Sequence, residues 1–227
     1  MKLELVIGNK NYSSWSMRPW VLLRQAEIPF TEVELKFEDG QDGLKVVGIE
    51  KYSAARKVPV LLVDGQPVWD SLAICETAAE MFPEKRLWPQ AADARRFARS
   101  ACAEMHSGFQ ALRGRMPMNI RNRYPGKGLT PESRKDIERV VALWTECRER
   151  FGGSGNLLFG TFSVADAFYA PVVMRFHAYA VELPRIAQDY CNAVQALAAV
   201  REWCDGARRE SEFVAEDEPY STNPAKK

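Results

Sequence analysis

The chain has 227 residues, of which 46% are hydrophobic and 27% charged, and its formal net charge is +1. This composition is typical of a globular protein with one large domain or two modest ones, and the balanced charge argues against a nucleic-acid-binding protein. No apolar run approaches the ~18 residues that cross a bilayer and no signal-peptide pattern follows Met1, so we expect a cytoplasmic protein that does not bind membranes.

The first eighty residues alternate strand-like and helix-like patterns. Asp64-Gly65 between two apolar runs predicts a hairpin. The expected elements are a strand over 3–7, a helix over 17–25, a strand over 30–37, a loop over 38–56 with one helical turn near 43–47, strands over 58–63 and 67–69, and a helix over 71–82. This order predicts a small mixed sheet with helices packed on it.

After Trp88-Pro89 almost nothing is strand-like. Helical periodicity predicts an all-α second domain, with helices over 95–114, 131–151, 164–181 and 191–210. We therefore expect one domain over residues 1–84, a linker over 85–92 and a helical domain over 93–227. The polar tail from about Glu216, with Pro219 and Pro224, is expected to be loosely held.

Cysteine and histidine usage bears on the chemistry of the chain. The five cysteines form no CxxC pair, which favours reduced structural thiols, and two histidines make a metal site improbable. The cysteines are Cys75, Cys102, Cys147, Cys191 and Cys204.

The turn Ser13-Ser14-Trp15-Ser16-Met17-Arg18 follows the first strand and opens the first expected helix. Hydroxyl and amide donors at the positive end of a helix stabilise an anion such as a thiolate or a phosphate. The turn is therefore a candidate active site. The alternative is that Ser14 or Ser16 simply caps the helix.

Two further motifs follow strands: Lys57-Val58-Pro59-Val60, and Asp70-Ser71-Leu72-Ala73-Ile74 at a helix start. With the seryl turn, and in this order, they resemble the cytosolic glutathione transferases over nearly the whole chain, in particular the serine-using classes related to tau and zeta. The resemblance implies an α/β plus all-α fold: a thioredoxin-like N-terminal domain followed by a C-terminal helical bundle.

The resemblance implies that Ser13, five residues before Arg18, is the catalytic serine, with Ser14 as the alternative. Only the thiolate of glutathione attacks an electrophile well, and a free thiol with a pKa of ~8.5 is mostly protonated at neutral pH. A seryl hydroxyl that donates to the sulfur lowers that pKa. The serine would thus be a donor, and the sulfur of glutathione the nucleophile.

The resemblance also assigns four residues to glutathione binding. Val58, before a cis-proline, would pair with the cysteinyl part, and Lys57 is a candidate partner for the glycine carboxylate, although an exposed lysine is solvated by default. Ser71 and the first helical amides would hold the γ-glutamyl carboxylate, and Asp70 would address the γ-glutamyl end. Asp70 stands where the family more often has glutamate; helix capping is the alternative role for this motif.

Ser163-Val164-Ala165-Asp166 resembles the N-capping box of the family's core helix, which we interpret as structural.

The electrophile pocket is expected between the domains. Its candidates are Trp15, His106, Phe109, Arg113 and Met116, although each could instead belong to the interhelix core or to a solvated surface. Arg113, Arg115, Arg121 and Arg123 form a basic stretch, and if some of them reach the cleft, an anionic substrate becomes plausible.

The leading hypothesis is a glutathione S-transferase that acts on a small electrophile, as in detoxification, and the resemblance implies a homodimer. The alternatives are a zeta-like cis-trans isomerase of a small unsaturated acid and a non-catalytic binding or regulatory relative. An omega-type oxidoreductase is disfavoured because those relatives have a cysteine where this chain has Ser13.

Overall fold

The computed structural model describes residues 1–40 and 43–222. Its N-terminal part contains a four-stranded sheet of β1 (Leu3–Ile7), β2 (Thr31–Glu34), β5 (Val60–Val63) and β6 (Gln66–Val68), in the order β2-β1-β5-β6. β1 runs parallel to β2 and antiparallel to β5, and β5 runs antiparallel to β6. The expected thioredoxin-like arrangement of strands is confirmed.

The sheet buries both of its faces. Leu5 and Leu61, paired across β1 and β5, join the main core, whereas Val6 and Val60 point to the opposite face and pack with Ile49. This alternation follows from the two-residue period of a strand. Both faces therefore need a cover.

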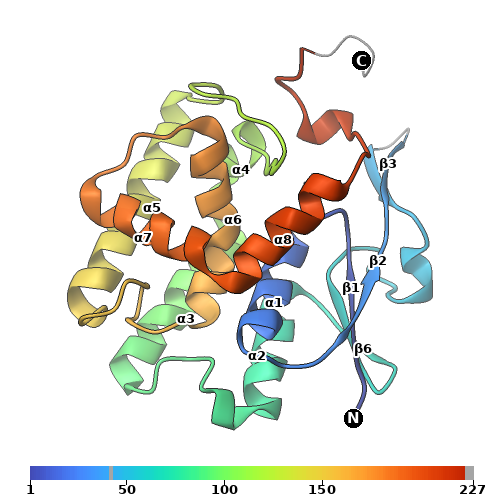
Figure 1. Ribbon diagram of the computed structural model, residues 1–227, viewed down its shortest axis with the longest axis horizontal. Helices are drawn as coiled ribbons and strands as arrows, with labels where there is room; N and C mark the ends of the chain where they lie inside the picture. Colours follow the sequence, from blue (N-terminus) through green and yellow to red (C-terminus); the bar gives the residue numbers. More distant parts are fainter. Residues whose placement is uncertain (41–42, 223–227) are drawn as a thin grey trace.

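Helices α1 (Ser14–Gln25) and α2 (Ser71–Met81) lie between the sheet and the rest of the molecule (Figure 1). α1 contacts β1 on one side and α6 and α8 on the other, which explains why Met17, Val21 and Leu22 are fully buried. The start of α1, which carries the seryl turn, therefore lies where the two halves of the chain meet.

The segment 38–56 contains more regular structure than the sequence predicts. β3 (Phe37–Gly40) pairs antiparallel with β4 (Gly43–Val46), followed by the 3-10 turn η1 (Ile49–Lys51). The expected helical turn near 43–47 is a strand instead. Part of the predicted loop, residues 41–42, lies outside the described residues.

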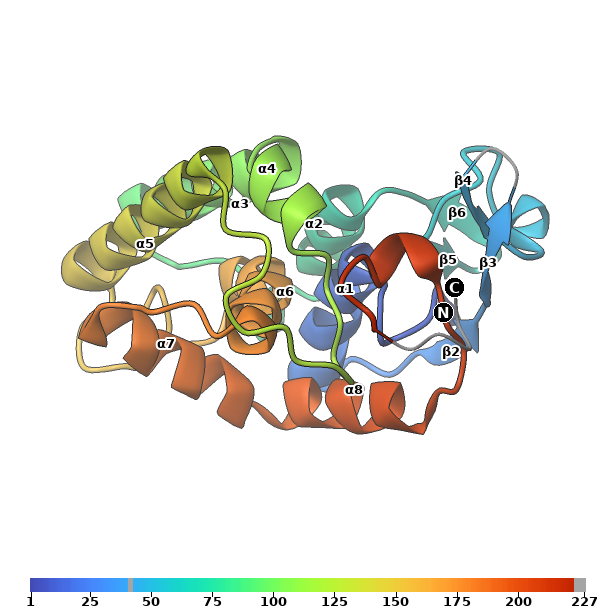
Figure 2. The same ribbon diagram turned by 90° about the horizontal axis from the view of Figure 1, so that it is seen from above.

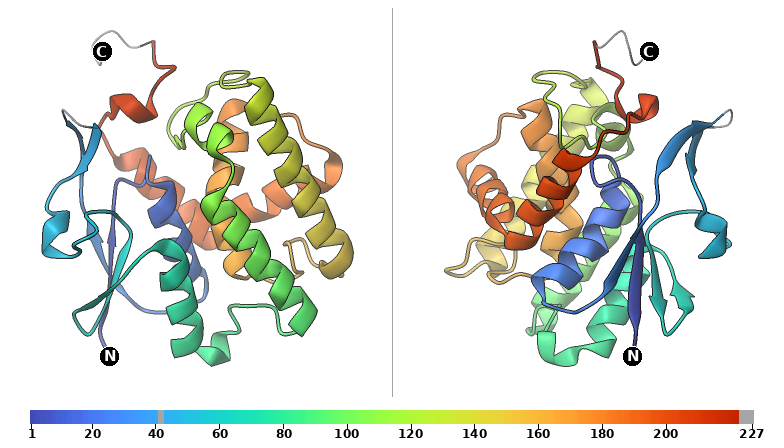
Figure 3. Two further views of the ribbon diagram at one scale, coloured as in Figure 1. Left: turned by 180° about the vertical axis from the view of Figure 1, so that it is seen from behind. Right: turned by 45° about the vertical axis from the view of Figure 1, so that its right-hand side comes forward.

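The second half is helical, and its helices lie side by side (Figure 3). After the short turn η2 (Pro83–Lys85), it consists of α3 (Ala92–Ser107), α4 (Gln110–Arg115), α5 (Pro131–Phe151), α6 (Val164–Tyr179), α7 (Arg185–Ala196) and α8 (Ala198–Arg209). α6 is buried along almost its whole length and contacts α1, α3 and α7. The expected fold class is confirmed.

Two expected helices are each divided in two. The first breaks after Gly108, where Phe109 adopts a left-handed backbone with φ 58°. The second breaks at Leu197, whose backbone is extended with φ −60° and ψ 135°. In both places the apolar periodicity continues across the break, so the pattern alone does not reveal it.

The capping box at the start of α6 forms as expected. The carboxylate of Asp166 accepts hydrogen bonds from the backbone N–H groups of Ser163 at 2.9 Å and Leu158 at 3.1 Å. Both amides are buried, so Asp166 satisfies donors that would otherwise have no partner.

Residues 210–222, which we call the C-terminal strap, turn back over the N-terminal domain after α8 (Figure 2). The strap contains the 3-10 turn η3 (Ala215–Asp217). The buried carboxylate of Glu218 accepts hydrogen bonds from Tyr12 at 2.8 Å, Tyr124 at 2.5 Å and Asn122 at 2.9 Å. The prediction of a loosely held tail is therefore wrong as far as residue 222; residues 223–227 lie outside the described part.

Within the described ranges, no helix is both long and apolar enough to cross a membrane.

Candidate active site

Two adjoining cavities occupy the cleft between the domains, and Trp15, Lys57, Val58 and Arg113 line both. The serine cavity, of about 510 Å³, is lined further by Tyr12, Ser13, Ser14, Phe37, Val46, Arg56, Gln110, Gly114, Pro117, Arg175 and Asp217. The α2 cavity, of about 560 Å³, is lined further by Ala55, Pro59, Trp69, Asp70, Ser71 and His106. Residues distant in the sequence thus meet around one cleft.

Nine of the eleven candidate site residues line this cleft. The other two, Phe109 and Met116, are 7% and 0% exposed, belong to the main hydrophobic core and line neither cavity. Phe109 sits at the break between α3 and α4, and this placement directs it into the core.

Ser13 is the N-cap of α1 and is 5% exposed. Its hydroxyl donates to Ser16 Oγ at 2.7 Å and accepts from the backbone N–H of Ser16 at 3.4 Å. Ser13 therefore caps the helix and lines the cavity at the same time. A rotation of its hydroxyl group is enough to redirect the proton from Ser16 to a ligand.

Ser14 has a different partner. Its Oγ accepts a hydrogen bond from Arg175 Nη2 at 3.2 Å, so the guanidinium occupies an acceptor position and leaves the Ser14 proton for another acceptor. Both serines line the cavity, and each has a geometry that suits a donor.

Arg175 projects from α6 and is a site residue that the sequence analysis does not find. It is 4% exposed, and its other hydrogen bonds go to the carbonyls of Met116 at 2.8 Å and Pro171 at 3.4 Å. Burial, and then the neighbouring charge of Arg113, lower the pKa of Arg175 to about 10, which still leaves it charged at neutral pH. The sequence does contain one sign of this residue: Arg175 is the only arginine in a long apolar helix, and a buried charge there requires specific partners.

Trp15 forms the wall between the two cavities. The guanidinium groups of Arg18 and Arg113 lie 4.1 and 4.3 Å from the centre of its ring. Arg18 is 1% exposed and its Nε and Nη1 atoms have no hydrogen-bond partner within the described chain. Cation–π contacts with Trp15 and Phe168 replace those bonds, and they hold the indole in place.

In the α2 cavity, Asp70 is the N-cap of α2 and accepts from the backbone N–H of Leu72 at 3.2 Å. Its other carboxylate oxygen lies 3.1 Å from Nε2 of His106, so the pair joins the two domains. Ser71 is fully buried, yet no partner for its Oγ lies within the described chain. A buried hydroxyl without a partner costs about 1–3 kcal/mol, and a ligand anion at the helix start would satisfy it.

The Val58–Pro59 peptide bond is cis, as the resemblance implies, and the exposed Lys57 precedes it on the rim of both cavities. Positive charge dominates the cleft, from Arg56, Lys57, Arg113 and Arg175. These features suit an anionic ligand.

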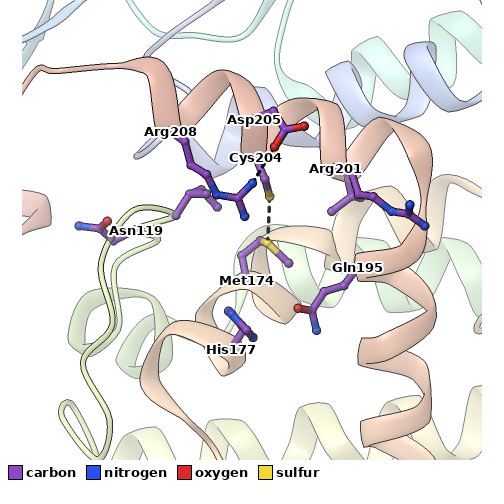
Figure 4. A pocket seen from close by; sticks show the side chains of 10 residues that line it. Asn119, Met174, His177, Gln195, Arg201, Cys204, Asp205 and Arg208 are labelled. Atoms are coloured by element: carbon purple, nitrogen blue, oxygen red, sulfur yellow. Dashed lines mark hydrogen bonds and ion pairs between the residues drawn. The ribbon is translucent and has the colours of Figure 1, made fainter.

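A further cavity of about 300 Å³, which we call the outer cavity, lies between α6, α8 and the segment before Arg121 (Figure 4). The sulfur atoms of Met174 and Cys204 meet there at 3.6 Å. None of the predicted site residues lines it. All five cysteines are buried and free, as expected of structural thiols.

Residues 12–81 match the family described as the glutathione S-transferase N-terminal domain, and residues 90–206 match the glutathione S-transferase C-terminal domain. A probable maleylacetoacetate isomerase of Caenorhabditis elegans is 31% identical over 172 residues, which cover 75% of this chain and 77% of that protein.

Solved structures share the fold. A glutathione transferase homolog from Burkholderia, with bound glutathione, has a TM-score of 0.70 at 19% identity and covers 92% of this chain and 100% of its own. The tau class glutathione S-transferase of mango, Mangifera indica, has a TM-score of 0.65 at 15% identity, with coverage of 91% and 96%.

Proposed function

Because the chain belongs to the glutathione S-transferase family, we propose that it binds glutathione in the cleft, activates the thiol as the thiolate and adds it to a small electrophile. The observation that carries the proposal is the pairing of two anion-binding helix starts in one cleft. The start of α2 offers the unpartnered Ser71 hydroxyl, and the start of α1 offers Ser13 and Ser14.

The α2 cavity takes the γ-glutamyl end in this proposal. The hydroxyl of Ser71 and the first amides of α2 hold the α-carboxylate, and Asp70 receives the ammonium group. The backbone of Val58 pairs with the cysteinyl part, and Lys57 attracts the glycine carboxylate.

The serine cavity then takes the sulfur. Ser13 donates a hydrogen bond to the thiolate, with Ser14 as the alternative donor. The charge of Arg175, which lines the same cavity, further favours the charged form of the sulfur. Each of these contributions lowers the pKa of the bound thiol and raises the thiolate fraction at neutral pH.

A second candidate reaction is the cis-trans isomerisation of a small unsaturated acid. Thiolate addition, bond rotation and thiolate release complete that reaction without net conjugation. Two observations favour it: the cations Arg113 and Arg175 in the serine cavity, and the similarity to a probable maleylacetoacetate isomerase. Mass analysis of the product separates the two reactions, since only conjugation retains glutathione.

The experiment compares Ser13→Ala with Ser14→Ala. We expect Ser13→Ala to lower kcat by about 10²-fold, because loss of one hydrogen-bond donor to an anion, here the thiolate, usually has an effect of this size. Ser14→Ala should have a smaller effect on kcat. The ultraviolet absorbance of the bound thiolate, measured against pH, gives the pKa of the glutathione thiol. This pKa must be higher in Ser13→Ala than in the native chain.

The reverse order of effects would make Ser14 the donor. Unchanged turnover and an unchanged thiol pKa in both variants would contradict the proposed mechanism. A folded chain that fails to bind immobilised glutathione would instead support a non-catalytic relative. We extend the proposal to a homodimer, which light scattering tests.

A further inference from the structure

The C-terminal strap contributes one residue, Asp217, to the lining of the serine cavity. Among the described residues that line this cavity it is the only one with a carboxylate, and Arg56, Lys57, Arg113 and Arg175 supply positive charge there. The family match to the C-terminal domain ends at residue 206, so Asp217 lies outside it.

The strap holds Asp217 firmly in this position. Arg121 donates hydrogen bonds to the carbonyls of Glu210 and Glu212, and Val214 is fully buried against Tyr12 and Phe37. Beyond Asp217, the carboxylate of Glu218 is bound from three sides. Contacts on both sides of η3 thus fix the backbone that carries the carboxyl group.

The Asp217 carboxyl group nevertheless has no ion-pair partner within 4.0 Å in the described chain. Arg175 lines the same cavity, and the hydrogen bonds of its guanidinium go to Ser14, Met116 and Pro171. No hydrogen bond or ion pair joins the two side chains, and the charge of Arg175 acts on Asp217 only by lowering its pKa. Both residues line the serine cavity, so a substrate bound there would lie near both charges.

We propose that Asp217 is a specificity-determining residue that selects between neutral and anionic electrophiles in the serine cavity. When Asp217 is ionised, it offsets the charge of Arg175 and repels a substrate carboxylate. When it is protonated, the guanidinium is free to attract that carboxylate. This inference rests on the proposed function in that it places the electrophile in the serine cavity.

The surroundings of Asp217 place this change near neutral pH. Burial raises its pKa and Arg175 lowers it, while the carboxylates of Glu216, Glu218 and, from β3, Asp39 raise it, to about 7 in all. Tyr12 also lines the cavity, but burial and Glu218 raise its pKa to about 12, and the lining arginines and Lys57 are cationic. Acidification through pH 7 therefore favours anionic substrates.

The test uses two glutathione S-conjugates that differ by one ring carboxylate, S-(dinitrophenyl)glutathione and its ring-carboxylated analogue. Calorimetry on the full chain measures both dissociation constants at about pH 5.5 and about pH 8.5. The quantity compared is the Kd of the carboxylated conjugate divided by the Kd of the neutral conjugate. We expect this ratio to be about fivefold higher at pH 8.5 than at pH 5.5, because ionised Asp217 repels the ring carboxylate across a partly screened distance. In Asp217→Asn, this ratio should stay low at both values.

Glu216→Gln is the matched control, because it removes the adjacent carboxylate from the same turn but not one that lines the cavity. The Glu216→Gln variant should retain the rise in the Kd ratio, with its midpoint at a lower pH because one carboxylate that raises the Asp217 pKa is gone. A constant ratio in the native chain, the same rise in Asp217→Asn, or no binding of either conjugate would each overturn the proposal. Turnover of chlorodinitrobenzene is measured separately: its absence, with the ratio still dependent on pH, would contradict conjugation but not the role of Asp217.

Discussion

The interdomain cleft and the outer cavity differ in how their polar groups are satisfied. In the outer cavity, Arg208 pairs with Asp205 at 2.7 Å, and the ring of His177 pairs with Arg123 at 2.8 Å. In the cleft, Ser71 Oγ and Nδ1 of His106 are buried and have no partner within the described chain. Cationic side chains line both regions, but in the cleft the unpartnered hydroxyl belongs to Ser71, the first residue of α2.

The difference teaches that volume and charge do not identify a ligand site by themselves. A protein that leaves a buried hydroxyl without a partner bears its desolvation cost, and a ligand removes that cost when it binds. The outer cavity also holds one such atom, Nδ2 of Asn119. Asn119 itself lies in the segment between α4 and α5 and does not begin a helix. Groups that are satisfied within the protein should contribute to stability, and groups that are not should contribute to binding.

The largest expected effect comes from a fully satisfied group. Asp166→Ala should lower the free energy of unfolding by about 3 kcal/mol, because two buried amides lose their acceptor. Glutathione affinity of the folded fraction should not change. Chemical denaturation measures the loss, and Asp205→Ala, which removes an exposed carboxylate, is the control. If Asp166→Ala lowered the free energy of unfolding no more than Asp205→Ala does, the conclusion that satisfied buried groups contribute to stability would be wrong.

An intermediate effect is expected from Ser71→Ala, where no protein partner is lost. Glutathione should bind about tenfold more weakly, the loss of one hydrogen bond to a charged group, while the free energy of unfolding stays constant or rises. Calorimetry and denaturation together provide the two measurements.

Ser133→Ala is the matched control for Ser71→Ala. Ser133 is equally buried near a helix start, but its hydroxyl accepts from Thr130 N at 2.8 Å and donates to the Gly128 carbonyl at 2.8 Å. The Ser133→Ala variant should have a lower free energy of unfolding than the native chain and the same affinity for glutathione. If Ser71→Ala instead lowered stability without weakening glutathione binding, and Ser133→Ala weakened binding, then unpartnered buried groups would not mark the ligand site.

The smallest effect is expected in the outer cavity. Arg208→Ala removes one member of an exposed ion pair, so the free energy of unfolding should change by less than about 1 kcal/mol. Glutathione affinity and turnover should stay within about twofold of the native values, within the range of a substitution remote from the cleft. A larger loss of affinity would mean that the outer cavity is coupled to the cleft.

The sequence predicts well whatever depends on local pattern. Residues 131–151 form α5 as expected. The three motifs on which the resemblance rests meet in one cleft because each stands at the end of a strand or the start of a helix. The strands β3 and β4 are missed because their polar, glycine-bearing sequence lacks an apolar alternation. The break at Leu197 is missed because no glycine or proline marks it.

Long-range contacts account for the rest. Arg175 reaches Ser14 across 161 positions of the chain, and the partners of Glu218 come from segments about 94 to 206 positions earlier. A polar tail with two prolines gives no local sign of such partners. Composition therefore suggests a loose end where the structure has an anchored one.

The strap also bears on the site, because one short segment contacts the turn that carries the candidate serines. Tyr12, the neighbour of Ser13, has two acceptors within reach of its hydroxyl, the Glu212 carbonyl and the Glu218 carboxylate, and both belong to the strap. A substitution of Asp217 changes the lining of the serine cavity while the three sequence motifs stay intact. A deletion of the strap would therefore remove contacts of the residue next to Ser13 and one residue of the serine cavity at the same time.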